Sequence, residues 1–406
     1  MNRILIYPIR SMMSHENMIS SDSEKLLKEL KERMGDCEFS FLTSPSELQG
    51  DGLPLILVQS GGSEGYFLRE VYPCFKGPYY LLTYGSCNSL AASLEILTFL
   101  KDRNEPSEVL HGDMDYIVSR LKALSAGSRQ KPGGRLGILG EPSDWLISSH
   151  DEQKGCKEKL GIELIDIPMQ EVKDAVASAS PVEMDGRPTA IVGTADHSQR
   201  VAEAIPGALQ IYGGLLEIVR SRELDGFTIR CFDLLTEVGN TGCLSLAAFN
   251  AKGIPAGCEG DVPALLAMTV ARALTGKTGF MANPSRMDAE SGRIVFAHCT
   301  VPLDMVDDAL LDTHYESGIG VGIRGHIPET PVTIFKLSGD LKRVFAAEGV
   351  IERNLSEPNL CRTQIELRLD DPSLIGSYFL GNPIGNHHII VPGRWADELK
   401  AIVADL

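Results

Sequence analysis

Short apolar runs alternate with amphipathic stretches through the first part of the chain. Strand patterns occur at residues 3–8, 54–59 and 79–83, and helical patterns at residues 21–33 and 90–101 lie between them. Parallel strands need a long crossover connection, which is usually a helix, so this alternation is typical of a parallel sheet covered by helices. The pattern predicts a first Rossmann-like α/β domain over residues 1–106.

The same alternation continues in the next part of the chain. A helix predicted at residues 108–125 bridges to it, and the predicted strands lie at residues 135–139, 162–167, 189–192 and 227–235. The apolar stretch 243–249, closed by Gly253, predicts a short helix that returns to a strand near Ile254. These elements predict a second Rossmann-like α/β domain over residues 107–276.

After residue 276 the pattern changes to short strands separated by turn residues. Strands are predicted at residues 293–297, 318–323, 332–337, 364–369 and 388–391, and a helix at residues 395–404 follows them. Short strands with turn signals between them are typical of antiparallel sheets. The last part, residues 277–406, is therefore predicted to be a β-rich domain with a terminal helix.

Carboxylates follow two neighbouring strands of the second predicted sheet. Glu237 follows the strand at 227–235, and Glu259 and Asp261 follow the next strand. A right-handed crossover makes those strands parallel, so the three carboxylates should meet at the ligand-binding edge of the sheet. Carboxylates this close repel each other unless they share a proton or a cation bridges them. Each also has a structural alternative: Asp261 as a helix N-cap, Glu237 as a solvated loop residue, and Glu259 as a partner of the helix dipole.

Three histidines are candidates to complete a metal site with these carboxylates. His387 and His388 lie between Gly385 and an apolar run, so on a strand their side chains point to opposite faces and one of them enters a given site. We favour His387 as the ligand. His388 is then a supporting residue, a substrate contact or a structural histidine. His298 follows a strand, where a lone histidine is more often structural.

These motifs resemble two related sugar isomerases, most clearly from residue 225 to 393. Glu237 followed by Asp261 at the start of a helix, with Asn386-His387 later, is similar to the metal-ligand pattern of L-fucose isomerase. The Cys-Glu-Gly-Asp run at 258–261, Phe-Met at 280–281 with a strand ending in His298, and Gly-Asn-His-His at 385–388 resemble L-arabinose isomerase.

One difference from the arabinose enzymes affects the choice of ligands. Where they carry a carboxylate directly after Phe-Met, this chain has Ala282 and then Asn283. The pair of Glu259 with a second glutamate is therefore not available. The fucose-type pair of Glu237 and Asp261 is favoured instead.

The resemblance implies a metal-dependent aldose–ketose isomerase that acts on a small unphosphorylated sugar through an enediol. It implies Glu237 and Asp261 as metal ligands and proton carriers and His387 as the third ligand, with Glu259, His298 and His388 as further candidates. Oxygen ligands with one imidazole suit Mn²⁺, or else Mg²⁺. The resemblance also implies a C-terminal β-barrel and a homo-oligomer, a trimer or hexamer. A non-catalytic sugar-binding or regulatory relative, or a metal-dependent hydrolase or aldolase, remains an alternative.

Composition limits the classes of partner. The 406 residues carry a formal net charge of −17, which argues against nucleic acid or an anionic membrane as a partner, because phosphates are bound by clustered Lys and Arg. The chain has no long apolar segment of the kind that spans a membrane, and its nine cysteines include no C-x-x-C motif. These features predict a cytoplasmic protein with reduced, mostly buried thiols.

Overall fold

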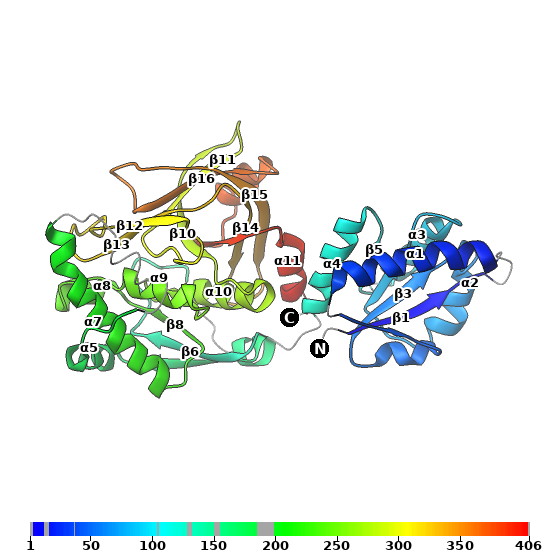
Figure 1. Ribbon diagram of the computed structural model, residues 1–406, viewed down its shortest axis with the longest axis horizontal. Helices are drawn as coiled ribbons and strands as arrows, with labels where there is room; N and C mark the ends of the chain where they lie inside the picture. Colours follow the sequence, from blue (N-terminus) through cyan, green and yellow to red (C-terminus); the bar gives the residue numbers. More distant parts are fainter. Residues whose placement is uncertain are drawn as a thin grey trace. The chain divides into compact units, whose positions relative to one another are not determined.

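The computed structural model describes residues 3–11, 16–35, 37–103, 105–127, 132–149, 155–184 and 199–404. These residues form two compact units, Met1–Arg129 and Gln130–Leu406 (Figure 1). The first unit extends beyond residue 106, and the second contains both the second parallel sheet and the β-rich part. No helix in the described ranges is both long and apolar enough to cross a bilayer.

The first unit is a five-stranded parallel sheet in the order β2-β1-β3-β4-β5. Alternate residues of its strands face opposite sides, so Ile4 and Ile6 pack in one core cluster while Tyr7 and Ile9 pack in another. Its elements are β1 Arg3–Ile9, α1 Glu16–Met34, β2 Glu38–Phe41, a 3₁₀ turn Pro45–Gln49, β3 Leu53–Val58, α2 Glu64–Tyr66, a π turn Phe67–Val71, β4 Tyr79–Leu82, α3 Ser89–Lys101, β5 Ser107–Leu110 and α4 Met114–Gly127.

The helix predicted at residues 108–125 differs from the structure at its start. Ser107–Leu110 is strand β5, which pairs with β4, and α4 begins only at Met114. Gly112, at φ +143°, separates the two elements in a conformation that favours glycine. The chain therefore completes the first sheet before it leaves this unit.

The second unit begins with a four-stranded parallel sheet in the order β7-β6-β8-β9. Its elements are β6 Gly134–Leu139, a π turn Cys156–Leu160, β7 Ile162–Ile167, α5 Met169–Ser178, α7 Gln199–Ser221, β8 Gly226–Ile229, α8 Phe232–Glu237, α9 Cys243–Ala251, β9 Ala256–Gly257 and α10 Val262–Thr275. The strand predicted at residues 189–192 lies outside the described residues.

The last part of the chain closes into an antiparallel barrel, β10-β11-β16-β15-β14-β17, because β17 also pairs with β10. The predicted fold class, two parallel-sheet α/β parts followed by a barrel, is confirmed. The elements are β10 Phe280–Asp288, β11 Arg293–His298, β12 Asp308–Asp312, β13 Gly322–His326, β14 Pro331–Leu337, β15 Val344–Asn354, β16 Thr363–Leu369, a π turn Ile375–Phe379, β17 His388–Pro392 and α11 Ala396–Ala404.

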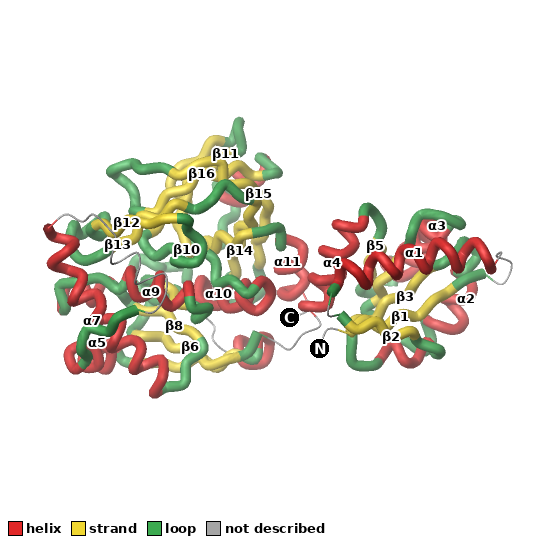
Figure 2. Tube along the Cα trace, viewed as in Figure 1, coloured by secondary structure: helices red, strands yellow, loops and turns green. Residues whose placement is uncertain are grey.

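Helix α10 joins the second sheet to the barrel (Figure 2). It packs on β8 and β9 of the sheet and on β14 and β17 of the barrel. Every residue from Val262 to Ala271 is buried, as expected for a helix that is covered on all sides. One hydrophobic core therefore runs through the sheet and the barrel, and it fixes the position of the start of α10 relative to β17.

Candidate metal centre

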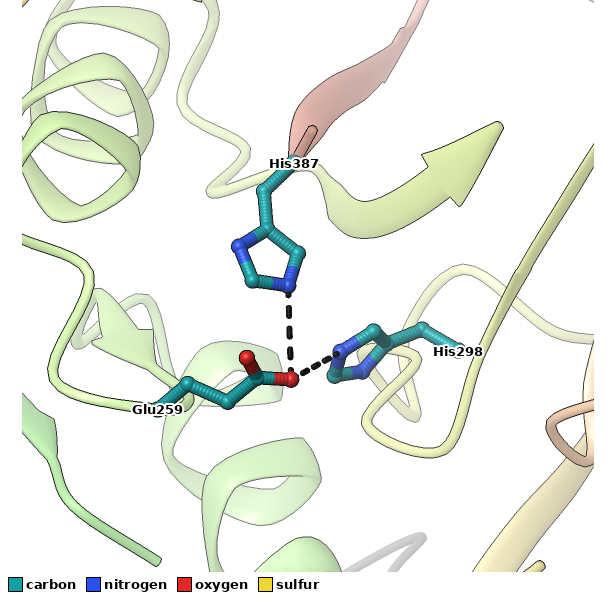
Figure 3. A group of neighbouring side chains, drawn as sticks. All are labelled: Glu259, His298 and His387. Atoms are coloured by element: carbon teal, nitrogen blue, oxygen red, sulfur yellow. Dashed lines mark ion pairs between the residues drawn. The ribbon is translucent and has the colours of Figure 1, made fainter. Parts of the chain in front are cut away.

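Glu259, His298 and His387 bring their side chains to one point inside the second unit (Figure 3). Glu259 Oε1 lies 3.5 Å from His387 Nε2 and 3.8 Å from His298 Nε2. The exposed fractions of the three residues are 8%, 5% and 0%. The atoms are too far apart for good hydrogen bonds, but a cation between them would reach each at roughly 2.0–2.2 Å.

The loop after β9 places Glu259. The strand is parallel to β8, so its carboxyl end lies at the sheet edge where the sequence predicts ligands. Glu259 has φ +61° and Gly260 φ +71°, both in the left-handed region. A Cβ on Gly260 would stand 2.7 Å from the Glu141 carbonyl oxygen, so the close approach of the two loops requires glycine there. A left-handed glutamate is a strained residue of the kind that gathers at functional sites.

Each histidine has one ring nitrogen engaged by a neighbour and the other turned toward Glu259. His298 is the last residue of β11, and its Nδ1 lies 3.0 Å from Thr300 Oγ1. His387 directly precedes β17, and its Nδ1 lies 2.8 Å from Asp261 Oδ2. A partner on one nitrogen fixes the ring and leaves the other nitrogen for a metal, which is the usual arrangement around histidine ligands.

Asp261 supports this group from behind His387. Its Oδ1 accepts a hydrogen bond of 2.8 Å from the Ala264 amide and caps α10, while Oδ2 accepts from His387. Lys336 Nζ lies 3.7 Å from Oδ2, and both side chains are buried. The predicted proximity of Asp261 and His387 is therefore present, with Asp261 as the cap of α10 and the hydrogen-bond partner of His387.

The structure corrects the placement of Glu237. The predicted strand 227–235 ends at Ile229, and the following residues form α8, whose last residue is Glu237. The side chain of Glu237 is 45% exposed and pairs with Lys173 of α5. Glu237 thus leaves the sheet edge on a helix and does not join Asp261 or the group around Glu259.

His388 points away from the group, as strand alternation predicts. Its Nδ1 donates to the Asn386 carbonyl at 2.8 Å, and its Nε2 lies 3.0 Å from the Tyr378 hydroxyl. Burial, with the nearby charge of Lys336, lowers the pKa of His388 to about 3. The aromatic rings of Phe296, Phe345 and Phe379 surround it. Of the alternatives for His388, this arrangement favours the structural histidine.

The charges of the group favour a cation at its centre. Burial opposes ionisation of Glu259, but His298 and His387 outweigh it and hold its pKa well below the usual range. Burial likewise opposes ionisation of Asp261, while Lys336 and His387 lower its pKa to about 2. Burial opposes protonation of His387, yet Asp261 and Glu259 raise its pKa to about 9. The ionised carboxylates of Glu259 and Asp261 thus stabilise the protonated form of His387. A bound cation would take the place of the proton on its Nε2.

Two unsatisfied polar atoms belong to this group and its support, His387 Nε2 and Lys336 Nζ. Among the described residues, buried side-chain atoms without a hydrogen-bond partner include Ser143 Oγ, Asn283 Oδ1, Lys336 Nζ and His387 Nε2. Ser143 donates its backbone N–H to the Glu259 carbonyl, and Lys336 lies beside Asp261. Buried polar groups without hydrogen-bond partners are costly, so the unsatisfied His387 Nε2 in this group favours a polar ligand there.

Trp145 covers the group on one side. Its indole N–H donates to Glu259 Oε2 at 2.6 Å, and its ring packs edge-on against Phe232. Trp145 is 51% exposed and lines a cavity of 530 Å³ together with Phe232, Glu316 and Ile319. Trp145 therefore contacts both the buried carboxylate and this cavity.

Trp145 provides a direct optical test of the site. The chain has two tryptophans, so Trp395→Phe leaves Trp145 as the single indole. Because Trp145 is hydrogen-bonded to Glu259, Mn²⁺ or Co²⁺ added to this variant is expected to quench its fluorescence saturably, and chelator should restore it. Adding Glu259→Gln to the Trp395→Phe variant should remove the saturable quenching. Quenching that is equal with and without Glu259 would place the cation elsewhere.

No protein-family model matches this sequence, and no curated protein matches it. Glu259 and His298, both within the motifs that resemble the arabinose enzymes, are brought together here with His387.

Proposed function

We propose that this protein is a divalent-metal-dependent enzyme, and specifically an aldose–ketose isomerase that acts on a small unphosphorylated sugar. The observation that carries the proposal is the convergence of Glu259, His298 and His387 on one buried point, with no hydrogen-bond partner at His387 Nε2. The resemblance to the isomerases supports the reaction type. Glu259, His298 and His387 each come from a different one of the three motifs that resemble the arabinose enzymes.

The donor set fits a divalent cation. One carboxylate oxygen and two imidazole nitrogens suit Mn²⁺, Fe²⁺ or Zn²⁺, and Mn²⁺ agrees best with the sequence resemblance. Bound there, the cation would polarise a substrate carbonyl and stabilise negative charge on the substrate oxygens. Three protein donors leave coordination positions for two neighbouring substrate oxygens.

The chain's own residues would position the site and move protons. Asp261 holds His387 in the tautomer whose Nε2 lone pair faces Glu259, and Trp145 orients the other carboxylate oxygen. Asp261 is completely buried behind His387, with one oxygen held by the Ala264 amide and the other by His387, so its proposed role narrows to positioning. We assign transfer of the carbon-bound proton to Glu259 Oε2, the oxygen on the side of Trp145 and the cavity.

Turnover in D₂O tests this proposal. Metal-free protein reloaded with Mn²⁺ is expected to interconvert at least one pair in a panel of unphosphorylated aldoses and ketoses. Because the proton leaves the sugar for Glu259, deuterium should appear at C1 of the ketose or C2 of the aldose, read by NMR. Glu259→Gln should be inactive, and Glu237→Gln should retain activity. Efficient isomerisation without deuterium uptake would contradict the proton role of Glu259.

A metal-dependent hydrolase is the second candidate, and the ligand set is the observation that favours it. Two histidines and one carboxylate around an open position are the ligands of several zinc hydrolases. If the Mn²⁺-loaded protein binds the ion but isomerises no sugar, and the Zn²⁺-loaded protein hydrolyses esters or amides, the hydrolase replaces the isomerase. The metal site itself would stand in either case.

A further inference from the structure

Asn283 carries a buried carbonyl oxygen for which the fold provides no donor. Its Oδ1 is inaccessible to solvent and accepts no hydrogen bond. Leaving such a group unpaired costs about 1–3 kcal/mol. The chain satisfies other inward-facing asparagines: Asn250 bonds both the N–H and the carbonyl of Ala256, and Asn354 does the same with Ile327. Asn283 is therefore an exception that needs a physical reason.

Strand register places Asn283 next to the strand ends that carry the two histidines, directly opposite His387. On one side Asn283 lies opposite Ala297 of β11, the residue before His298. On the other side Ala282 lies opposite His388 of β17, so the register continues from Asn283 to His387. Asn283 is thus the residue of β10 that stands across from His387, while its neighbour Ala282 stands across from His298.

The same face of β10 turns toward the third ligand. Met281 is two residues before Asn283, so both side chains leave the same face of the strand. The sulfur of Met281 lies 3.5 Å from the backbone nitrogen of Cys258, the residue directly before Glu259. This face of β10 therefore faces the loop that carries Glu259. The side chain of Asn283, with its unpaired oxygen, lies on the same face.

We propose that Asn283 Oδ1 is a fourth donor to the cation held by Glu259, His298 and His387. The inference rests on the metal site of the proposed function. An amide carbonyl is an accepted ligand for oxygen-preferring cations such as Mn²⁺, and coordination would satisfy the atom that the fold leaves unpaired. A neutral donor also leaves a divalent ion with one carboxylate a net charge of +1 at the site, which favours binding of an anionic substrate oxygen.

Direct measurement of Mn²⁺ affinity by calorimetry tests this role. Asn283→Ala removes the oxygen and is expected to weaken binding by about tenfold or more, the range found when groups that support a metal are lost. Asn283→Asp replaces the neutral oxygen by a charged one and is expected to tighten binding. Ser285→Ala, at an exposed position of the same strand, should leave the affinity unchanged. Thermal unfolding of the metal-free variants checks that each one folds.

The outcomes separate this inference from the metal site itself. If Mn²⁺ binding is lost in Glu259→Gln but is the same in wild type, Asn283→Ala and Asn283→Asp, the fourth donor is wrong and the three-residue site stands. If the wild-type protein binds no Mn²⁺, both are wrong. If Asn283→Asp does not fold, an unchanged affinity in Asn283→Ala alone overturns the inference.

Discussion

Replacing Glu259 by Gln is expected to weaken Mn²⁺ binding by more than about 100-fold, since even residues that only support metal ligands account for 10–100-fold. Glu259 supplies the carboxylate that faces both His298 Nε2 and His387 Nε2, and it is buried. Gln keeps the size of the side chain and one oxygen but loses the negative charge. Isothermal titration of the metal-free protein with MnCl₂ measures the effect.

Glu237→Gln is the matched control for that experiment, because it makes the same chemical change at the other candidate glutamate. Glu237 is half exposed and pairs with Lys173, so its replacement should leave Mn²⁺ affinity unchanged. If Glu259, His298 and His387 bind the metal, only Glu259→Gln loses binding. If Glu237 and Asp261 bind it, only Glu237→Gln does. Loss of binding in Glu237→Gln, with normal binding in Glu259→Gln, would restore the fucose-type pair and contradict the geometry described above.

Replacing Asp261 by Asn is expected to lower the free energy of unfolding by about 3–5 kcal/mol, the cost of breaking a buried ion pair by removing one partner. Asn still caps α10, so the loss comes from the two buried cationic partners of the carboxylate, His387 and above all Lys336, whose ammonium then has no counter-charge. Adding Lys336→Met removes that unpaired charge, so the double variant should recover most of the loss. Urea unfolding of the two single variants and the double variant measures the coupling.

The partly exposed pair Lys277–Asp304 provides the control for this cycle. Its side chains are 46% and 30% exposed at a separation of 2.6 Å, so Asp304→Asn should cost less than about 1 kcal/mol. A double variant of Asp261 and Lys336 that is as unstable as Asp261→Asn alone would show that Lys336 is not the source of the loss. If Asp261→Asn lowers the free energy of unfolding by less than about 1 kcal/mol, the main structural role of Asp261 is to cap α10.

The fold class is predictable from the sequence because the apolar pattern differs between its parts. Strands alternate with helices up to residue 276, and short strands separated by turns follow. It did not locate the end of β8, because an apolar run such as 227–235 fits a strand or a helix equally well. Only Gly226–Ile229 is strand, and the next residues turn into α8. That one boundary moved Glu237 from the sheet edge to a helix end paired with Lys173.

The candidate site was predictable where ligands are set by local motifs and not where they depend on barrel register. Asp261 and His387 were expected together, and they are hydrogen-bonded. The sequence favours Glu259 less because the second arabinose-type glutamate is missing, and His298 less because a lone histidine is more often structural. Only the pairing of β10, β11 and β17 shows that the strand ends carrying the two histidines meet. No sequence signal indicated that Trp145 would reach across to Glu259.

Anomalous diffraction from crystals soaked in MnCl₂, recorded on both sides of the manganese absorption edge, tests the central claim most directly. We expect one ion bound by Glu259 Oε1, His298 Nε2 and His387 Nε2 at roughly 2.0–2.3 Å, with Asp261 outside the coordination sphere. Manganese bound between Glu237 and Asp261, or no manganese peak among Glu259, His298 and His387 at saturating concentration, would contradict it.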